Sequence, residues 1–381
     1  RRLSGANINL EELTTEGVKP RQKILNSFES YHATGRQLQT VYKIITPDNI
    51  DNVNEFNYNV NYCYIDNAIS IREITRPSFS IFTTCYNSYD KIYRAYNSLI
   101  SQTHKDWEWV IIDDSPDDKH FNFLREISKK DKRIRLYKRD FNSGNIGNVK
   151  NESIGLCRGK YILELDHDDI VLSDVLTDAF NEFEKNSDVG FIYMECANVY
   201  ENWNNFWYSD FICKGYGGYI KEKYNNHWVN TYVTPNINNI TLTALFCLPN
   251  HPRIWRKSVL MQLESYSEFL PICDDFEILL RTALSTKITK IQKLGYIQFM
   301  NNNNNNFSLI RNSEINRIGP QYIYPQFFDK YKVHDKMKQL NGYEDEFYIN
   351  NHSPLWLREN YTYNYINKRI NNDYDKQYCL I

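Results

Sequence analysis

Short apolar runs alternate with amphipathic stretches along the chain from residue 79 onward. The runs 79–84, 107–114 and 134–138 are rich in β-branched and aromatic residues, which is typical of buried strands. Between them, the segments 91–102 and 121–130 space their apolar residues as one face of a helix does. Strands separated by helices of this length predict a parallel sheet with helices on both faces.

The same alternation continues further along the chain. A helix is expected over 147–157, followed by a strand over 160–166, a helix that starts with Ser173 as its N-cap, and a strand over 189–194. The segment 195–250 loses this regularity and is rich in aromatic residues and glycine. We expect it to form loops and hairpins over the sheet edge that hold the variable substrate.

The regions that flank residues 76–320 lack the α/β alternation. The pattern therefore predicts one α/β domain over 76–320, an N-terminal extension over 1–75 that packs on it, and a C-terminal helical extension over 321–381. Within the domain, the asparagine run 301–306 favours neither helix nor strand and is predicted to be a mobile loop.

Composition narrows the class of protein. A chain of 381 residues has room for a large core. Its formal net charge of -2 argues against a nucleic-acid partner, because nucleic acids favour a basic surface. Its eight cysteines show no metal-ligand spacing, which indicates reduced thiols and favours a cytoplasmic location.

The sequence also bears on membrane insertion and assembly. No apolar run reaches the roughly 18 residues that a membrane span requires, so no membrane span is expected. The chain begins with Arg1 rather than Met, so the question whether a segment precedes Arg1 stays open. The question whether the protein forms a homo-oligomer stays open as well.

Polar residues gather where the predicted parallel strands end, which is the edge where such sheets bind ligands. We expect these residues to converge: Thr84, Tyr86 and Asn87 after the first strand, Asp114 after the second, and Asp166, Asp168 and Asp169 after the fourth. The last group consists of closely spaced carboxylates, which repel each other unless a cation lies between them. A divalent cation is one interpretation of this cluster, and a solvated acidic turn with Asp174 in a helix cap is the other.

Several motifs follow one another in order: an acidic pair after the second strand, the segment FNSGNIGNVKN, the cluster DHDD, and the acidic pair of CDDFEILLR. In this order they resemble a family 2 glycosyltransferase with the GT-A fold, over residues 77–315, and DHDD resembles the DXD motif of that family. The resemblance implies a Rossmann-like, mostly parallel sheet flanked by helices. It also implies an inverting enzyme that uses a divalent metal, Mn²⁺ or Mg²⁺, and a nucleotide sugar, with a UDP-sugar as the expected donor.

The metal would neutralise the charge that the donor's diphosphate acquires as it leaves. The resemblance makes Asp168 the metal ligand, with Asp169 next to it, and lets Asp166 reach the ribose or a metal-bound water. His251 in NHPRIWRK is a candidate for a further metal ligand. The alternative for His251 is a structural role at the start of a strand.

Recognition of the nucleotide is expected from the ends of the first two strands and from FNSGNIGNVKN. Asp114 would accept a hydrogen bond from uracil N3–H. Thr84 and Tyr86, with Asn87 beside them, would offer backbone groups and a stacking face. Lys150 stands where the family usually has arginine, so it would meet the diphosphate as a point charge without the bidentate fork. An ordinary exposed helix lysine is the alternative.

The acidic pair of DDFEILLR is expected to carry the chemistry of transfer. On a helix, Asp274 and Asp275 point about 100° apart, so only one of them can face a cleft. The resemblance places Asp275 at the family's catalytic aspartate, which takes the proton from the acceptor hydroxyl. The alternative is that both carboxylates only favour the start of the helix.

Two basic residues, Arg311 and Arg317, follow the asparagine run. They are predicted to fold over the diphosphate as part of a lid when the donor binds. A solvated basic helix is the alternative.

Together these features predict a hexosyl-transferring enzyme whose acceptor is a hydroxyl of a glycan, glycoconjugate or protein. A sugar nucleotidyltransferase is the alternative among enzymes, but the segment TTCYNSYD after the first strand lacks the Gly-rich, basic loop of that class. A non-catalytic carbohydrate-binding or scaffold domain is the alternative outside enzymes, and the presence of Asp168 and Asp275 argues against it.

Overall fold

The computed structural model describes residues 76–301, except 140–141, 208–217, 238–247, 269 and 271, and in addition residues 311, 313 and 315. The predicted extensions over 1–75 and 321–381, and the predicted loop beyond Asn301, lie outside the described residues. The chain forms two compact units. The first contains the residues up to Tyr89, Asp106–Ile162 and Leu260–Ile278, and the second contains Asp90–Lys105, Leu163–Val259 and the residues from Leu279 onward.

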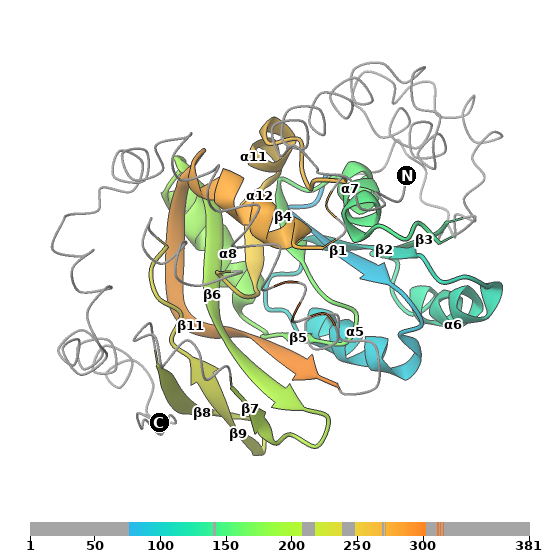
Figure 1. Cartoon of the computed structure of the whole chain (residues 1–381), viewed down its shortest axis with the longest axis horizontal. Helices are drawn as coiled ribbons and strands as arrows, with labels where there is room; N and C mark the ends of the chain where they lie inside the picture. Colours follow the sequence, from blue (N-terminus) through green and yellow to red (C-terminus); the bar gives the residue numbers. More distant parts are fainter. Residues whose placement is uncertain are drawn as a thin grey trace, which may run out of the picture. The chain divides into compact units, whose positions relative to one another are not determined.

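Strands β1 (Phe79–Cys85), β2 (Trp107–Asp113) and β3 (Ile134–Lys138) form the sheet of the first unit, in the order β3-β2-β1 (Figure 1). Both pairings are parallel. Nearly every residue of these strands is buried, as expected for a parallel sheet that helices cover. The register pairs Cys85 with Asp113, so β1 and β2 end side by side. The predicted α/β sheet is confirmed here.

Helices α6 (Asp118–Ser128) and α7 (Ile146–Leu156) cover this sheet, α6 against β3 and α7 against β1 and β2 (Figure 1). Each helix starts at a side-chain acceptor, Asp117 or Asn145, that takes a hydrogen bond at 2.9 Å from a backbone N–H of the first turn. Such caps satisfy N–H groups that have no partner inside the helix. Both predicted helices are confirmed, α6 with an earlier start.

A mixed sheet forms the core of the second unit, in the order β10-β6-β11-β5. Its long strands β6 (Val189–Tyr200) and β11 (Lys287–Met300) run parallel to each other. Strand β10 (Arg253–Arg256) is antiparallel to β6, and β5 (Ile170–Val171) is antiparallel to β11. The prediction that the strand would end at residue 194 is wrong, because β6 goes on pairing with β11 as far as Tyr200.

Hairpin strands add to the strands of the second unit. β7 (Asn205–Phe206) pairs with β6, and β8 (Tyr219–Tyr224) pairs with β9 (His227–Tyr232), which also pairs with β6. All of these pairings are antiparallel, and the three short strands lie beside one end of β6 (Figure 1). The hairpins predicted within 195–250 are confirmed for the described residues of that segment.

Helices α5 (Ile92–Ile100) and α8 (Val175–Lys185) belong to the second unit, where α5 packs on β5 and α8 packs on β6 and β11. The prediction of Ser173 as the N-cap of α8 is wrong, since Asp174 occupies that position. The Ser173 carbonyl instead accepts a hydrogen bond from Thr103 N at 2.8 Å. This bond ties the residue to the segment that follows α5.

The division between the units falls within β4 (Tyr161–Glu164), α11 (Lys257–Gln262), α12 (Asp274–Ala283) and the short 3-10 helix Tyr89–Lys91. Among the helices that the structure describes, none combines the length and the apolar content that a bilayer crossing requires. The described cysteines are buried thiols, as their scattered positions predicted: Cys85, Cys157, Cys196 and Cys273.

Candidate functional site

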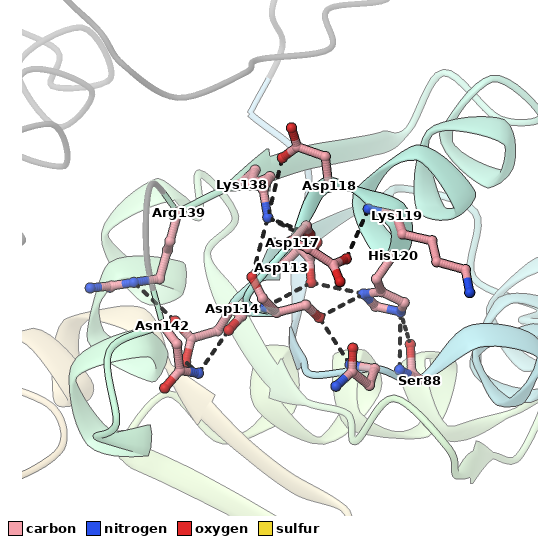
Figure 2. A network of polar contacts seen from close by, with 12 residues as sticks. Ser88, Asp113, Asp114, Asp117, Asp118, Lys119, His120, Lys138, Arg139 and Asn142 are labelled. Atoms are coloured by element: carbon pink, nitrogen blue, oxygen red, sulfur yellow. Dashed lines mark hydrogen bonds and ion pairs between the residues drawn. The ribbon is translucent and has the colours of Figure 1, made fainter.

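Asp114 directly follows β2 in the first unit and is 9% exposed. Ser143 N donates to its Oδ1 at 2.9 Å. Asn142 Nδ2 donates to its Oδ2 at 2.9 Å (Figure 2). Arg139 Nε lies 3.1 Å from Oδ1. Burial raises the pKa of Asp114 to about 6, although Arg139 and Ser143 oppose the rise. At neutral pH the side chain is therefore an ionised and oriented acceptor, which suits recognition of an N–H donor.

Arg139, which directly follows β3 and is 3% exposed, was not selected from the sequence. Its guanidinium pairs with Asp114 and with Glu152, and it donates to Asn148 Oδ1 at 3.1 Å. Arg139 thus links the end of β2 to α7 and favours the ionised form of Asp114. The rule that ligands bind beyond strand ends could have identified it, because it comes immediately after a predicted strand.

The segment after β1 contains the other predicted nucleotide contacts of the first unit. Thr84 is half-buried, whereas Tyr86 is 47% exposed, so its ring offers an accessible face. Asn87 has a φ of 50°, in the left-handed region, and its backbone N–H donates to Ser115 Oγ at 2.9 Å. Because β1 and β2 end side by side, the structure brings these residues to the same sheet edge as Asp114.

Lys150 on α7 pairs with Asp274 at the start of α12. Its Nζ lies 3.1 Å from Asp274 Oδ2 and 4.7 Å from the centre of the Tyr266 ring. Lys150 is therefore not an ordinary exposed helix lysine. Asp274 is buried, whereas Asp275 is half-buried and accepts a hydrogen bond from Phe276 N at 2.8 Å. The more accessible Asp275 is the better candidate to meet an acceptor hydroxyl, and Asp274 is the better candidate to hold Lys150.

The segment FNSGNIGNVKN brings α7 close to the chain that leads to α12. A Cβ on Gly147 would lie 2.4 Å from Ser267 O, so a larger residue would force the two segments apart. Asn151 Nδ2 donates to Tyr266 O at 2.9 Å, and Tyr266 N donates back to Asn151 Oδ1 at 2.9 Å. Several residues of this motif thus hold α7 against residues 266–267.

The acidic turn after β4 belongs to the second unit, and its carboxylates differ in burial. Asp166 and Asp168 are half-buried, whereas Asp169 is 1% exposed. Phe299 N donates to Asp169 Oδ1 at 2.7 Å, and the Tyr296 side chain also hydrogen-bonds to this carboxylate. Burial, and after it the charges of Asp168 and Asp166, raise the pKa of Asp169 well above its usual value. The structure thus places the predicted ligand Asp169 against β11.

Asp168 lies on the more accessible part of this turn. Its Oδ2 accepts a hydrogen bond from Asn301 Nδ2 at 3.1 Å, and its Oδ1 lies 3.7 Å from His167 Nδ1. Its backbone carbonyl accepts a hydrogen bond from Arg94 NH1 at 3.1 Å. The Arg94 guanidinium also lies 3.9 Å from the centre of the Phe299 ring. Arg94 could not be selected from the sequence, since its partner is 74 residues away.

Glu164, Asp166 and His251 form a group in the second unit that could hold a metal ion. One ligand atom from each lies within 4.8 Å of the others. His251 Nε2 is 3.3 Å from Glu164 Oε2, and no hydrogen bond reaches this nitrogen from the described residues. Ligand bonds of about 2.1 Å would place neighbouring ligand atoms about 3 Å apart, so a cation would require a small closure of the group.

The structure therefore brings the predicted residues Asp166 and His251 together and adds Glu164. An acidic residue inside an otherwise apolar strand was the signal for Glu164. Arg253 NH1 lies 3.5 Å from Glu164 Oε2, and its positive charge opposes a second cation at that oxygen. The group thus offers carboxylate oxygens and one imidazole nitrogen as ligands, and the guanidinium of Arg253 lies beside it.

The predicted lid is described only in part. Arg311 is half-buried in a turn, where its carbonyl accepts a hydrogen bond from Ile315 N at 2.9 Å. Arg317 lies outside the described residues. The lid stays a prediction, and so does the convergence of the first-unit and second-unit residues on one ligand.

Comparison with known proteins points to a class of enzyme. Residues 80–263 match the family model for Glycosyl transferase family 2. An uncharacterized glycosyltransferase of Methanocaldococcus jannaschii is 27% identical over 271 residues, which is 71% of this chain and 83% of the relative. The chondroitin synthase of Escherichia coli is 25% identical over 256 residues, which is 64% of this chain and 33% of the synthase. The chain thus spans about a third of the length of that synthase.

One solved structure with a similar course is the mannosyltransferase PcManGT from Pyrobaculum calidifontis in complex with GDP-Man and Mn²⁺. It covers 87% of this chain and 81% of its own, at 10% identity and a TM-score of 0.47. The sequence matches support a glycosyltransferase. More specifically, the match over residues 80–263 supports the predicted family 2, and the predicted α/β fold with a central sheet flanked by helices is confirmed.

Proposed function

We propose that the chain is an inverting, metal-dependent glycosyltransferase that moves a hexosyl group from a UDP-sugar to a hydroxyl of a glycan, glycoconjugate or protein. The observation that carries this proposal is the group of Glu164, Asp166 and His251 at the end of β4, within the segment that matches family 2. The chondroitin synthase among the relatives supports a glycan as the acceptor.

A divalent cation, Mn²⁺ or Mg²⁺, would be held by Asp166, His251 and Glu164, with Asp168 as a further carboxylate. Carboxylates together with an imidazole suit a transition-metal ion better than Mg²⁺, which favours Mn²⁺. When bound, the cation would supply positive charge to the departing diphosphate. Asp169 would support the turn from inside, since its carboxylate is held by the Phe299 N–H of β11.

The nucleotide would be recognised by residues of the first unit. Asp114 would accept the uracil N3–H in its ionised form, and Tyr86 would stack on the base with its exposed ring. Thr84 and Asn87 would contribute backbone groups beside it. The diphosphate would be met by basic residues, for which Lys150, Arg311 and Arg317 are the candidates.

Asp275 would act as the general base that takes the proton from the acceptor hydroxyl as its oxygen attacks the anomeric carbon. Its accessibility supports this role, because Asp274 is buried and paired with Lys150. The two aspartates would therefore have different tasks. Asp274 would hold α7 at the start of α12, and Asp275 would meet the substrate.

The proposal is tested by calorimetric titration of UDP, with and without MnCl₂, into the wild type, Asp166→Asn and Asp174→Asn. Asp174 is a matched control because its carboxylate pairs with Lys293 and lies outside the candidate metal group. Wild type and control should bind UDP more tightly with Mn²⁺. Asp166→Asn should lose most of that gain, on the order of tenfold or more in affinity.

Other outcomes decide between the parts of the proposal. If the wild type binds UDP equally well with and without Mn²⁺, the metal dependence in this proposal is wrong. No UDP binding under either condition would overturn the choice of a UDP-sugar as donor. Release of UDP from a UDP-sugar in the presence of an acceptor then distinguishes an enzyme from a carbohydrate-binding domain.

A further inference from the structure

A buried line of polar side chains runs through the first unit from Ser88 through His120 to Asp113 (Figure 2). Ser88 Oγ lies 2.8 Å from His120 Nε2, and His120 Nδ1 lies 2.8 Å from Asp113 Oδ1. The order of groups is the same as in a hydrolytic Ser-His-Asp relay. Ser88 is 1% exposed and both His120 and Asp113 are 0% exposed, so no substrate can reach the hydroxyl. The line must therefore have another task.

The hydrogen bonds indicate the donor and acceptor roles of the two ring nitrogens of His120. Ser88 N lies 3.0 Å from His120 Nε2, and a backbone N–H can only donate, so Nε2 must be the acceptor. The ring proton is then on Nδ1, where it is donated to Asp113 Oδ1. The same carboxylate oxygen accepts Ser115 N at 3.1 Å. His120 thus links the turn after β1 to the end of β2.

The turn that His120 holds has an unfavourable backbone. Asn87 and Tyr89, on either side of Ser88, have φ values of 50° and 42°, in the left-handed region that non-glycine residues rarely occupy. Asparagine tolerates this region, but a bulky tyrosine does not favour it. The Tyr89 ring packs edge-on against the His120 ring, with centroids 5.0 Å apart. Such a turn persists only where its surroundings hold it.

This turn and the end of β2 carry the residues assigned above to the nucleotide. Asn87 lies within the turn, and its N–H donates to Ser115 Oγ at 2.9 Å. Ser115 Oγ is in turn 3.0 Å from His120 Nδ1. Asp114 lies between Asp113 and Ser115, both of which contact the His120 ring. One imidazole therefore connects both segments that would meet the base.

We propose that His120 is a positioning residue that sets the nucleotide-binding edge of the first unit. It fixes the left-handed turn after β1 relative to the end of β2, so that Tyr86 and Asn87 have a defined geometry with respect to Asp114. This inference rests on the proposed function, because it assigns His120 a role in the binding of the donor base. His120 itself does not touch the donor.

The test is His120→Phe, which keeps a buried aromatic ring beside Tyr89 and removes both ring nitrogens. Uridine is the probe for calorimetry, because it presents the base without the phosphates. Loss of the hydrogen bonds that shape the turn should weaken uridine binding on the order of tenfold. The KM for the UDP-sugar should rise by a similar factor, whereas kcat should change less than about twofold, since the reacting groups are untouched.

His104→Phe is the matched control, because the His104 ring also packs on an aromatic ring, that of Phe180, and lies in the second unit. Its uridine affinity should equal that of the wild type. A second pair guards against a His120 variant that fails to fold. Ser115→Ala removes the acceptor of the Asn87 N–H and should weaken uridine binding, while Ser115→Thr keeps a hydroxyl and should restore it.

Unchanged uridine binding and an unchanged KM in both His120→Phe and Ser115→Ala would overturn this inference and leave the proposed function intact. An equal loss in His104→Phe would overturn it too, because the effect would then be one of general stability. If the wild type itself binds neither uridine nor UDP, the proposed function fails and the inference fails with it. The two failures are therefore distinguishable in one set of titrations.

Discussion

Carboxylates stand at strand ends in both units, but they are surrounded differently. In the first unit, Asp113 is bonded by His120 and Asp114 is paired with Arg139. In the second unit, the neighbours of Asp169 include two other carboxylates, those of Asp168 and Asp166, whose charges raise its pKa further after burial has raised it. Side chains of the protein offset the charges of the first-unit carboxylates, which are called compensated below. The charges of the second-unit carboxylates are offset only in part.

This difference indicates what each set can bind. A compensated carboxylate such as Asp114 can stay ionised without an added ion and can accept a hydrogen bond from a ligand. Crowded carboxylates are more stable when a cation lies among them. The first unit therefore suits recognition of a neutral N–H group, and the second suits a divalent cation. Each of the following predictions tests one side of this comparison.

The largest effect is expected from Asp168→Asn in the second unit. The substitution removes a half-buried carboxylate from the acidic turn and should abolish transfer together with the gain in UDP affinity that Mn²⁺ provides. The fold should be retained, since Asp168 is not a core residue. Calorimetry with and without Mn²⁺ and a melting curve check both parts. A variant that still binds UDP more tightly with Mn²⁺ would show that Asp168 is not a ligand.

The next largest effect is expected from Asp275→Asn. An amide cannot accept the acceptor's proton at neutral pH, so turnover should fall on the order of 100-fold or more while UDP affinity is retained. Asp274→Asn is the paired variant. It should cost much less turnover, because the Asp274 carboxylate is paired with Lys150.

The outcome of this pair assigns the base. If Asp274→Asn loses turnover and Asp275→Asn keeps it, Asp274 is the general base. Two active variants would show that this helix does not supply it. Product release and calorimetry on the same protein preparations separate the loss of turnover from the loss of binding.

An effect of intermediate size on uridine affinity is expected when pH changes the ionisation of Asp114. Because burial raises the pKa of Asp114 to about 6, the carboxyl should be mostly ionised at pH 7 and mostly protonated at pH 5. If the ionised form binds, uridine affinity should fall about tenfold over that interval. Asp114→Asn should bind more weakly at pH 7 and lose the pH dependence. A wild-type affinity that is constant with pH would exclude Asp114 as the base contact.

The same raised pKa has a consequence for stability with a definite sign. The folded state holds the Asp114 proton more tightly than the unfolded state, so the free energy of unfolding should decrease as pH rises from 3.8 to about 6. Asp114→Asn should remove this part of the decrease. Urea unfolding of both proteins across that range measures the difference.

The smallest effect is expected from Arg94→Ala. Arg94 donates to the Asp168 carbonyl and pairs with the partly exposed Glu201, and an exposed pair contributes less than about 1 kcal/mol. Loss of the bond to the turn should weaken the Mn²⁺-dependent gain in UDP affinity by a few-fold. Glu201→Gln should have almost no effect, because it leaves the bond between Arg94 and Asp168. Equal losses in the two variants would assign the effect to the ion pair.

Local pattern determined much of the first unit. The alternation of apolar and polar residues predicted β1, β3 and α7 to within a residue or two, because strand and helix periods are expressed over a few neighbouring residues. The end of β6 was missed, since its last residues are strand only through pairing with β11 and the hairpins. The acidic residues that follow the strands were also evident from the sequence.

Only the tertiary structure decided which of these residues are partners. Lys150, which is predicted to meet a diphosphate, also pairs with Asp274, 124 residues away, because Gly147 allows α7 to approach the chain before α12. Glu164 is close to His251 because the end of β4 and the segment before β10 pack in one unit. Residue type and order indicated the resemblance to family 2 and the candidate chemistry of this protein. Which carboxylates are compensated and which are not was decided by packing, because electrostatic partners are set by distance in space and not along the chain.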